Sequence, residues 1–226
     1  MSVSRAQTIL AEADLRPHLK RAVGDERARA RVRRTGRGGL RPLRRPPANA
    51  IVVSVDEKTS IAAREPARPD TPPAPGRPAR RDSEYLRNGT QNLFAALEVH
   101  SGAVSGMTAA TRNQFDFITF LDQLEAEIPA GQRVIAILDN LSTHKTEAVR
   151  SWLDAHPRWR FVFTPKHASW LNQVELFFSI LARRLLKHGA FTSPHDLAVQ
   201  MLTFVEHYNL TAKPFAWTYT GKVLAR

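Results

Sequence analysis

Hydrophobic residues along the chain form two kinds of pattern, short β-branched runs and longer segments with helical spacing. The runs 51–55 and 134–138 are continuously apolar, which is typical of strands covered on both faces. Ser101-Gly102 is a hairpin signal between two further runs. The additional strands expected from these runs are 60–64, able to pair with 51–55, then 92–99, 103–107 and 160–163.

Apolar residues spaced three and four apart predict helices after the third strand and between the later ones. The expected helices are 117–128, about 145–155, 171–185 and about 195–208. The chain order is therefore three strands, helix, strand, helix, strand, helix. This order favours an α/β domain, a mixed sheet flanked by helices. The ribonuclease-H-like fold has the same order, an analogy that by itself assigns no function.

Two stretches lack such patterns. Residues 21–45 contain ten Arg and almost no large apolar residue, so they cannot bury enough surface to offset the entropy of ordering and are predicted to be disordered. Only a short helical pattern at 3–13 precedes them. In 66–78, six of thirteen residues are Pro, which predicts an extended loop because proline supplies no backbone donor.

Length and composition exclude several classes of protein. The chain has 226 residues and is 42% hydrophobic, which suits one ordinary domain with extensions. Cysteine is absent, so disulfides, cysteine nucleophiles and thiolate zinc sites are excluded. No apolar run approaches the roughly 20 residues of a membrane span, and no signal peptide is visible. The expectation is a soluble protein of the cytoplasm, with no membrane partner.

The net charge of +12 points to an anionic partner, most often nucleic acid. The first 50 residues hold 13 Lys and Arg against 4 Asp and Glu, which is three quarters of the net charge. The rest of the chain is nearly balanced, as a folded domain would be. The sequence therefore predicts a basic N-terminal arm attached to a domain of ordinary charge.

Three acids occupy positions where a carboxylate is costly. Asp56 and Asp139 each directly follow an apolar run, where an Asp is either a turn or cap residue or part of a site at the strand ends. Glu175 belongs to a helix that is apolar around nearly its whole surface, with Asn172 expected on the same flank. A lone Glu on a helix is usually solvated, but a charge in apolar surroundings needs a partner, and a shared cation would supply one.

Three carboxylates without cysteine favour a hard cation such as Mg²⁺ or Mn²⁺. Two such ions, held about 4 Å apart, can stabilise both the attacking and the leaving oxygen of a phosphodiester displacement. That chemistry suits a basic chain expected to bind nucleic acid.

Three blocks of the sequence, 53–60, 138–145 and 169–178, resemble the signature blocks of the Tc/mariner-like DDE transposases, in their bacterial insertion-sequence branch. Thirty-five residues separate Asp139 from Glu175, close to the spacing in that family. Further blocks at 85–97 and 207–219 match in the same order. The resemblance runs from about Ala48 to the C-terminus.

The resemblance implies a ribonuclease-H-like catalytic domain in which Asp56, Asp139 and Glu175 hold two divalent ions, Mg²⁺ or Mn²⁺. One ion would activate water, and later a DNA 3′-hydroxyl, while the other would stabilise the leaving oxygen. It implies DNA as partner and a homodimer on that DNA. Residues placed around the ligands or on DNA are Asn140, His144, Asn172, Arg183, Arg184 and Lys187. The alternative to a site role for His144 is that it starts a helix and is hydrogen-bonded by the backbone. The alternative to DNA contact for Arg183, Arg184 and Lys187 is that their charges only complement the helix dipole.

The domain division expected from these matches is 1–18, 19–47 and 48–226. Residues 1–18 resemble the remnant of a helix-turn-helix region, and 48–226 form the catalytic domain. The Arg-rich linker 19–47 does not resemble the family, which suggests translation out of frame, although an evolved DNA-binding arm would also be basic. Two other functions remain open: a structure-selective nuclease on the same fold, and a non-catalytic protein that binds nucleic acid through the arm.

Overall fold

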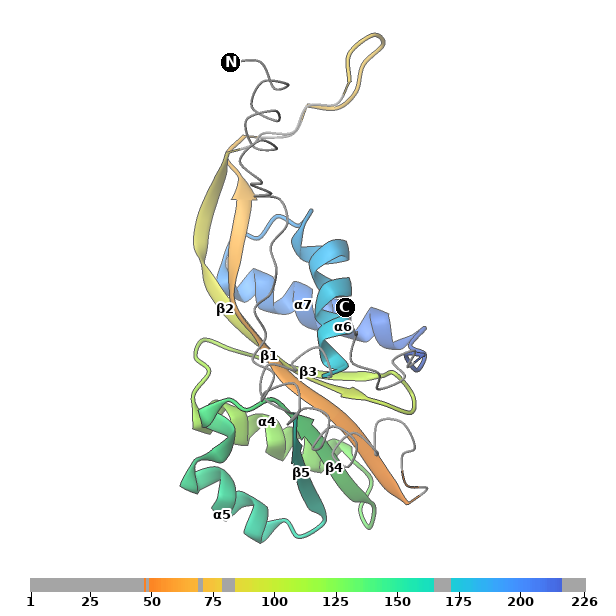
Figure 1. The fold of residues 1–226 in the computed structure, drawn as a ribbon. Coiled ribbons are helices and arrows are strands. Elements are labelled where there is room, and N and C mark those ends of the chain that lie inside the picture. The colour runs from red at the N-terminus through yellow and green to blue at the C-terminus, as the bar shows by residue number, and fades with distance from the viewer. Residues whose placement is uncertain (1–46, 48, 69–70, 79–83, 165–171, 217–226) are drawn as a thin grey trace, which may run out of the picture.

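The computed structural model describes residues 47, 49–68, 71–78, 84–164 and 172–216 (Figure 1). The predicted N-terminal arm and its short helix lie outside the described residues, as does Leu171 of the fourth predicted helix. No helix in the described part of the chain is long and apolar enough to cross a membrane.

A five-stranded mixed sheet forms the centre of the molecule, in the strand order β3-β2-β1-β4-β5. β1 is antiparallel to β2 and β2 to β3, whereas β1 is parallel to β4 and β4 to β5. The prediction of a mixed sheet flanked by helices is therefore confirmed. The strands are β1 (Ala50–Pro66), β2 (Tyr85–Glu98), β3 (Val104–Ala109), β4 (Arg133–Leu138) and β5 (Trp159–Phe163).

The first strand is longer than predicted. The run 60–64 does not fold back on 51–55 but continues it, so both belong to β1. Ser60 adopts a positive φ of 53° and its N–H donates to Asn92 Oδ1, so the chain bulges here without turning. β2 begins at Tyr85 rather than 92, because a polar segment pairs with the outer half of β1. Figure 1 shows the two strands running on together beyond the rest of the sheet.

Helices cover both faces of the sheet. They are α4 (Gln114–Glu127), the 3-10 helix η1 (Ser142–Lys145), α5 (Glu147–Ala155), α6 (Val174–Leu181), the π-helix η3 (Ala182–Leu186) and α7 (Pro194–Asn209). The single helix predicted over 171–185 is thus two consecutive segments, α6 and η3, that begin at Val174. In the π-helix the Lys187 N–H donates to the carbonyl of Ala182, five residues back.

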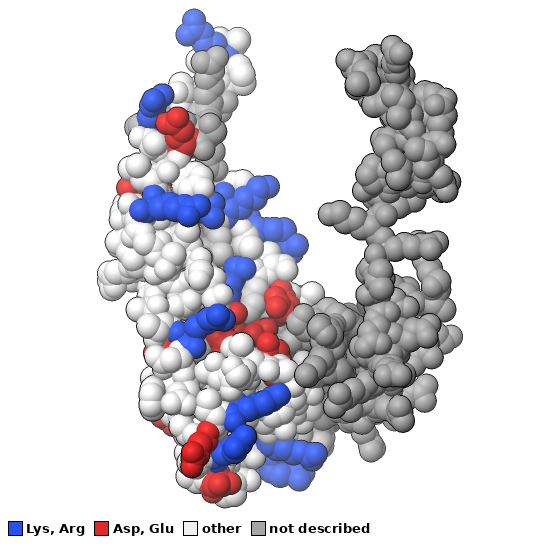
Figure 2. Space-filling view, turned by 60° about the vertical axis from the view of Figure 1, so that its left-hand side comes forward, with Lys and Arg blue, Asp and Glu red and all other residues white. Residues whose placement is uncertain are grey.

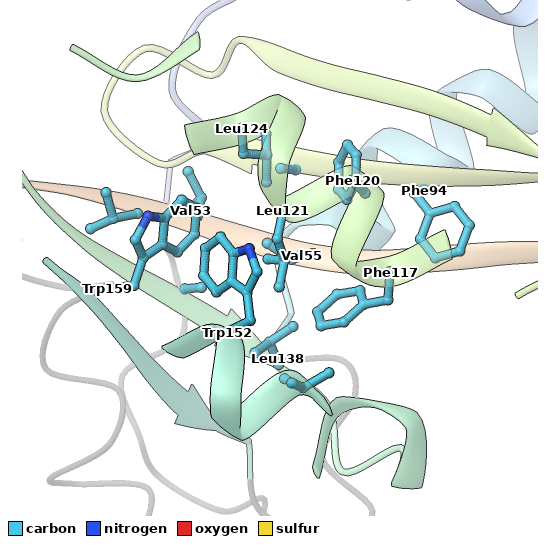
Figure 3. Packing of buried hydrophobic residues seen from close by; sticks show 14 residues of the cluster. Val53, Val55, Phe94, Phe117, Phe120, Leu121, Leu124, Leu138, Trp152 and Trp159 are labelled. Atoms are coloured by element: carbon cyan, nitrogen blue, oxygen red, sulfur yellow. The ribbon is translucent and has the colours of Figure 1, made fainter. Parts of the chain in front are cut away.

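Side chains that point alternately to the two faces of the sheet form two separate hydrophobic cores. Phe94 and Ala96 of β2 lie on the face covered by α4 and α5 (Figure 3), where Trp152 and Trp159 also pack, with ring centroids 5.3 Å apart. Their neighbour Ala95 lies on the other face, which α6 and α7 cover. Period-two alternation therefore sends successive residues of the central strands to opposite helix layers.

The turn between β2 and β3 lies against the chain that follows α7. Gly102 in this turn has a φ of 76°, and a Cβ at this position would overlap the carbonyl oxygen of Lys213. Beside it, the Asn209 side chain accepts from the N–H and donates to the carbonyl of Val104, both at 2.8 Å. The hairpin is therefore held against the end of α7 by the Asn209 side chain and by the close approach of the Gly102 and Lys213 backbones.

Gly102→Ala should destabilise the protein by roughly 2–5 kcal/mol, because the left-handed backbone and the overlap with Lys213 add. Gly131→Ala is the matched control, since Gly131 has a φ of 82° with nothing within 4 Å of its Cβ position. It should cost only about 1 kcal/mol. Urea unfolding of both variants measures the difference, and equal losses would contradict the close packing at Gly102.

Candidate active site

The parallel pairing of β1 with β4 brings two of the predicted acids together. The last register pair of these strands is Ser54 with Ile137. Asp56 and Asp139 each lie two residues beyond that pair, on neighbouring strands that run in the same direction. Asp56 does not end its strand as predicted, since β1 continues to Pro66, but it lies where its partner β4 ends.

Asp56 is 8% exposed, and its carboxylate accepts two hydrogen bonds. The Glu57 N–H donates to its Oδ1 at 2.9 Å, and Asn172 Nδ2 donates to its Oδ2 at 3.3 Å. Burial, and after it the negative charges of Glu57, Asp139 and Glu175, raise the pKa of Asp56 to about 7, although the backbone hydrogen bond from Glu57 lowers it. Asp56 is therefore a carboxyl group crowded by other carboxylates.

Asp139 is held in a defined orientation just after β4. Its Oδ1 accepts from the Leu141 N–H at 2.9 Å and lies 3.2 Å from His144 Nδ1. The His144 contact lowers the pKa of Asp139, and the Leu141 N–H and the charge of Lys145 lower it further. Unlike Asp56, this carboxylate is kept ionised by its surroundings.

His144 connects Asp139 to a residue that the sequence reasoning missed, Glu57. The imidazole is buried, and its Nε2 lies 2.8 Å from Glu57 Oε1. Burial alone would lower the pKa of His144, but the two carboxylates raise it to about 9. The ring also packs on Phe117, with centroids 4.4 Å apart. The His144 side chain therefore contacts two acids, Glu57 and Asp139. The backbone N–H of His144 also donates to the Leu141 carbonyl at 3.2 Å, which is the backbone contact expected for a helix-start residue.

Asn172 precedes α6 and does not share a helix flank with Glu175, which corrects the prediction. It is fully buried, accepts a hydrogen bond from the Ser54 hydroxyl, and donates to the carbonyl of Val55 at 2.8 Å. The backbone carbonyl of Asn172 accepts a hydrogen bond from the Glu175 N–H at 3.2 Å. Asn172 therefore joins the start of α6 to β1 beside Asp56.

Glu175 lies in the first turn of α6, and it is exposed rather than enclosed by apolar side chains as predicted. The buried face of α6 consists of its apolar neighbours Val174, Phe177 and Phe178. The negative charge of Glu175 nevertheless reaches Asp56, whose pKa it helps to raise.

Asn140 supports the end of the sheet rather than either acid directly. Its Nδ2 donates to the Thr164 carbonyl beyond β5, and its Oδ1 accepts from Lys145 Nζ at 2.7 Å. Lys145 Nζ lies 4.5 Å from the centre of the Phe163 ring. These contacts fix the segment after Asp139 against the neighbouring strand.

The three basic residues predicted near DNA are exposed at the other end of the α6–η3 segment from Glu175. Arg183 and Arg184 lie in η3, and Lys187 follows it. Arg184 lines a cavity of about 310 Å³ together with residues of α7. Among the described residues, no hydrogen bond or ion pair joins these three side chains to Asp56 or Asp139.

The three predicted ligands fit a hard cation by their chemistry. Among the residues that the structure describes, no three His, Asp or Glu side chains already form a closed ion site. Mutual repulsion of carboxylates, shown by the raised pKa of Asp56, is what a divalent cation relieves. Figure 2 shows a group of Asp and Glu side chains on one face, with Lys and Arg side chains above and below it.

A family model described as DDE superfamily endonuclease matches residues 51–198. The chain belongs to this family. The match contains Asp56, Asp139 and Glu175. A protein of Shigella sonnei named insertion element IS630 uncharacterized 39 kDa protein is 29% identical over 131 residues, which are 57% of this chain and 36% of that protein. The chain thus spans about a third of the length of this relative.

Solved transposase structures share the fold. The Mos1 transposase paired-end complex with left transposon end aligns with a TM-score of 0.62 and 20% identity, over 95% of this chain and 65% of that chain. The catalytic domain of Mos1 mariner transposase aligns with a TM-score of 0.56 and 18% identity, over 87% of both chains. The predicted ribonuclease-H-like fold is confirmed for this DDE endonuclease domain.

Stability should fall as pH rises, because the folded state holds His144 protonated. A folded-state pKa of about 9, above the ordinary 6.5, stabilises the fold fully below pH 6.5, and that contribution is lost as pH rises through 9. Its size is about 3 kcal/mol. The raised pKa of Asp56 acts in the same direction between about pH 4 and 7.

Urea unfolding at pH 6 and pH 9.5, with a chelator present, measures this difference. His144→Asn should remove most of it, while Asp56→Asn should remove only about 1.4 kcal/mol, the part of the Asp56 contribution that falls between pH 6 and 7. A wild-type stability that is equal at the two pH values would contradict the assignment.

Proposed function

We propose that this chain is the catalytic part of a bacterial insertion-sequence transposase, which cleaves DNA and transfers the cut strand. The observation that carries the proposal is the adjacency of Asp56 and Asp139 on parallel strands, beside Glu175, in a chain of the DDE endonuclease family. Names of relatives support it, since they include an IS630 insertion element protein and Mos1 transposase.

Asp56, Asp139 and Glu175 would hold two divalent cations, Mg²⁺ or Mn²⁺. Structures of the Mos1 catalytic domain have been solved with each metal, which supports a divalent ion here. The bound ions would supply charge stabilisation for the attacking and leaving oxygens of a phosphodiester. The number of ions is part of the proposal.

The protein's own residues orient the carboxylates for this reaction. Asn172 holds Asp56 through Nδ2 and ties it to the start of α6, which carries Glu175. His144 and the Leu141 N–H hold Asp139. The pKa of about 7 means that Asp56 gives up its proton near neutral pH, when a cation can replace it.

DNA is the proposed partner, both as transposon end and as target, with a homodimer acting on it. The Mos1 paired-end complex contains a transposon end, and the basic first 50 residues of this chain suit phosphate contacts. The bacterial nucleoid in the cytoplasm would be the site of action. The division into 1–18, 19–47 and 48–226 stays a proposal as well.

Replacing Asp56, Asp139 or Glu175 with Ala should each abolish Mg²⁺-dependent cleavage of DNA carrying the element's ends. Loss of one ligand disrupts the geometry of both ions, so a decrease of at least about 1000-fold is expected. Asp154→Ala, at an exposed position of α5, is the control and should cleave normally. Cleavage is followed on labelled duplexes, with circular dichroism to check the fold.

Near-normal cleavage by any one of the three variants would remove that residue from the ligand set. Joined products with an acceptor duplex distinguish the proposed transposase from a structure-selective nuclease, which would give hydrolysis alone. A protein that acts only by binding through its arm would be insensitive to all three substitutions.

DNA binding should depend steeply on salt and weakly on sequence, because most of the net charge lies in the first 50 residues. Each neutralised phosphate adds about 0.9 to the slope of log affinity against log salt. Deleting residues 1–47 should lower this slope by several units. Fluorescence anisotropy from 50 to 200 mM salt measures it, and an unchanged slope after deletion would contradict a role for the arm.

A further inference from the structure

Glu57 and His144 form a buried ion pair next to the proposed metal ligands. Their side chains are 4% and 0% exposed, and Glu57 Oε1 lies 2.8 Å from His144 Nε2. Removing such groups from water carries a large desolvation cost, which the fold tolerates only with good geometry. Neither residue is among the three carboxylates that we propose as ligands, so the pair requires its own explanation.

The position of the pair suggests that explanation. Glu57 follows Asp56 on β1, but its side chain lies on the opposite face, toward α4 and η1, where His144 packs on Phe117. The other ring nitrogen of His144, Nδ1, lies 3.2 Å from Asp139 Oδ1. A continuous line of contacts therefore runs from β1 through Glu57 and His144 to Asp139.

We propose that Glu57 is a positioning residue of this site, which acts through His144 to fix the Asp139 carboxylate relative to Asp56. This inference rests on the proposed function, because it assumes that Asp56 and Asp139 share a cation. Residues that hold metal ligands in place commonly change metal affinity 10- to 100-fold when they are replaced. Glu57 would have that role without touching the ion.

Two conservative substitutions separate positioning from a mere effect of charge. Glu57→Asp keeps the negative charge but withdraws the carboxylate by about 1.5 Å, the length of one C–C bond, so that it no longer reaches His144. Glu57→Gln removes the charge but keeps a carbonyl oxygen within reach of Nε2. A positioning role predicts that Glu57→Asp is the more damaging change, and a charge effect predicts the reverse.

The measurement is Mn²⁺ binding to the full chain by isothermal titration calorimetry, which does not require catalytic activity. We expect Glu57→Asp to weaken binding at least tenfold and Glu57→Gln to weaken it no more than about threefold. Glu65→Asp and Glu65→Gln are the matched controls, because Glu65 lies on the same strand and accepts from Asn88 Nδ2 at 2.9 Å. They should change binding less than twofold.

Glu57→Asp binding Mn²⁺ as tightly as Glu57→Gln, or more tightly, would overturn the inference. Asp139→Asn shows which proposal has failed. If the wild-type protein does not bind Mn²⁺, or Asp139→Asn binds it equally well, the proposed function fails. If Asp139→Asn loses binding while Glu57→Asp does not, only the positioning role fails. Melting curves without metal confirm that each variant is folded.

Discussion

The site depends above all on the parallel pairing of β1 with β4. Parallel strands point their carboxyl ends to one edge, so residues at equal distance beyond the last pair become neighbours. Asp56 and Asp139 satisfy this relation through Ser54 and Ile137. A slip of one residue in this register would send one acid to the wrong face of the sheet. The buried apolar runs before the two acids, which bind the strands to both helix layers, hold the register.

The two acids are supported from opposite faces of the sheet. Asp56 is reached from the α6 side, where buried Asn172 joins it to the start of that helix. Asp139 is reached from the α4 side, where His144 packs on Phe117. The two hydrophobic cores thus contribute separately to one site, and each carries a buried polar side chain that contacts a carboxylate.

The central part of this arrangement could be predicted from the sequence because it depends on local patterns. Continuous apolar runs marked β1 and β4, and the acid directly after each run predicted the two residues that the strand pairing brings together. The bulge at Ser60 could not be predicted, since it depends on a hydrogen bond to Asn92, 32 residues away. The contact of Glu57 with His144 could not be predicted for a similar reason, because the two residues are 87 positions apart in the sequence. The signal in the sequence that could have identified Glu57 was its charge inside a half-buried strand.

The exposure of Glu175 and the burial of Asp56 together suggest how a cation would complete the site. Asp56 is desolvated and crowded by three negative charges, which is why its pKa lies near 7. A divalent ion at this edge would reverse that balance, since its charge outweighs the repulsion and favours the ionised form. Glu175 is exposed in the first turn of a helix that Asn172 fixes to β1, so it would supply the outer carboxylate of the proposed ion site. Inner carboxylates held by hydrogen bonds, with an exposed outer one, would suit a phosphodiester that must enter, react and leave.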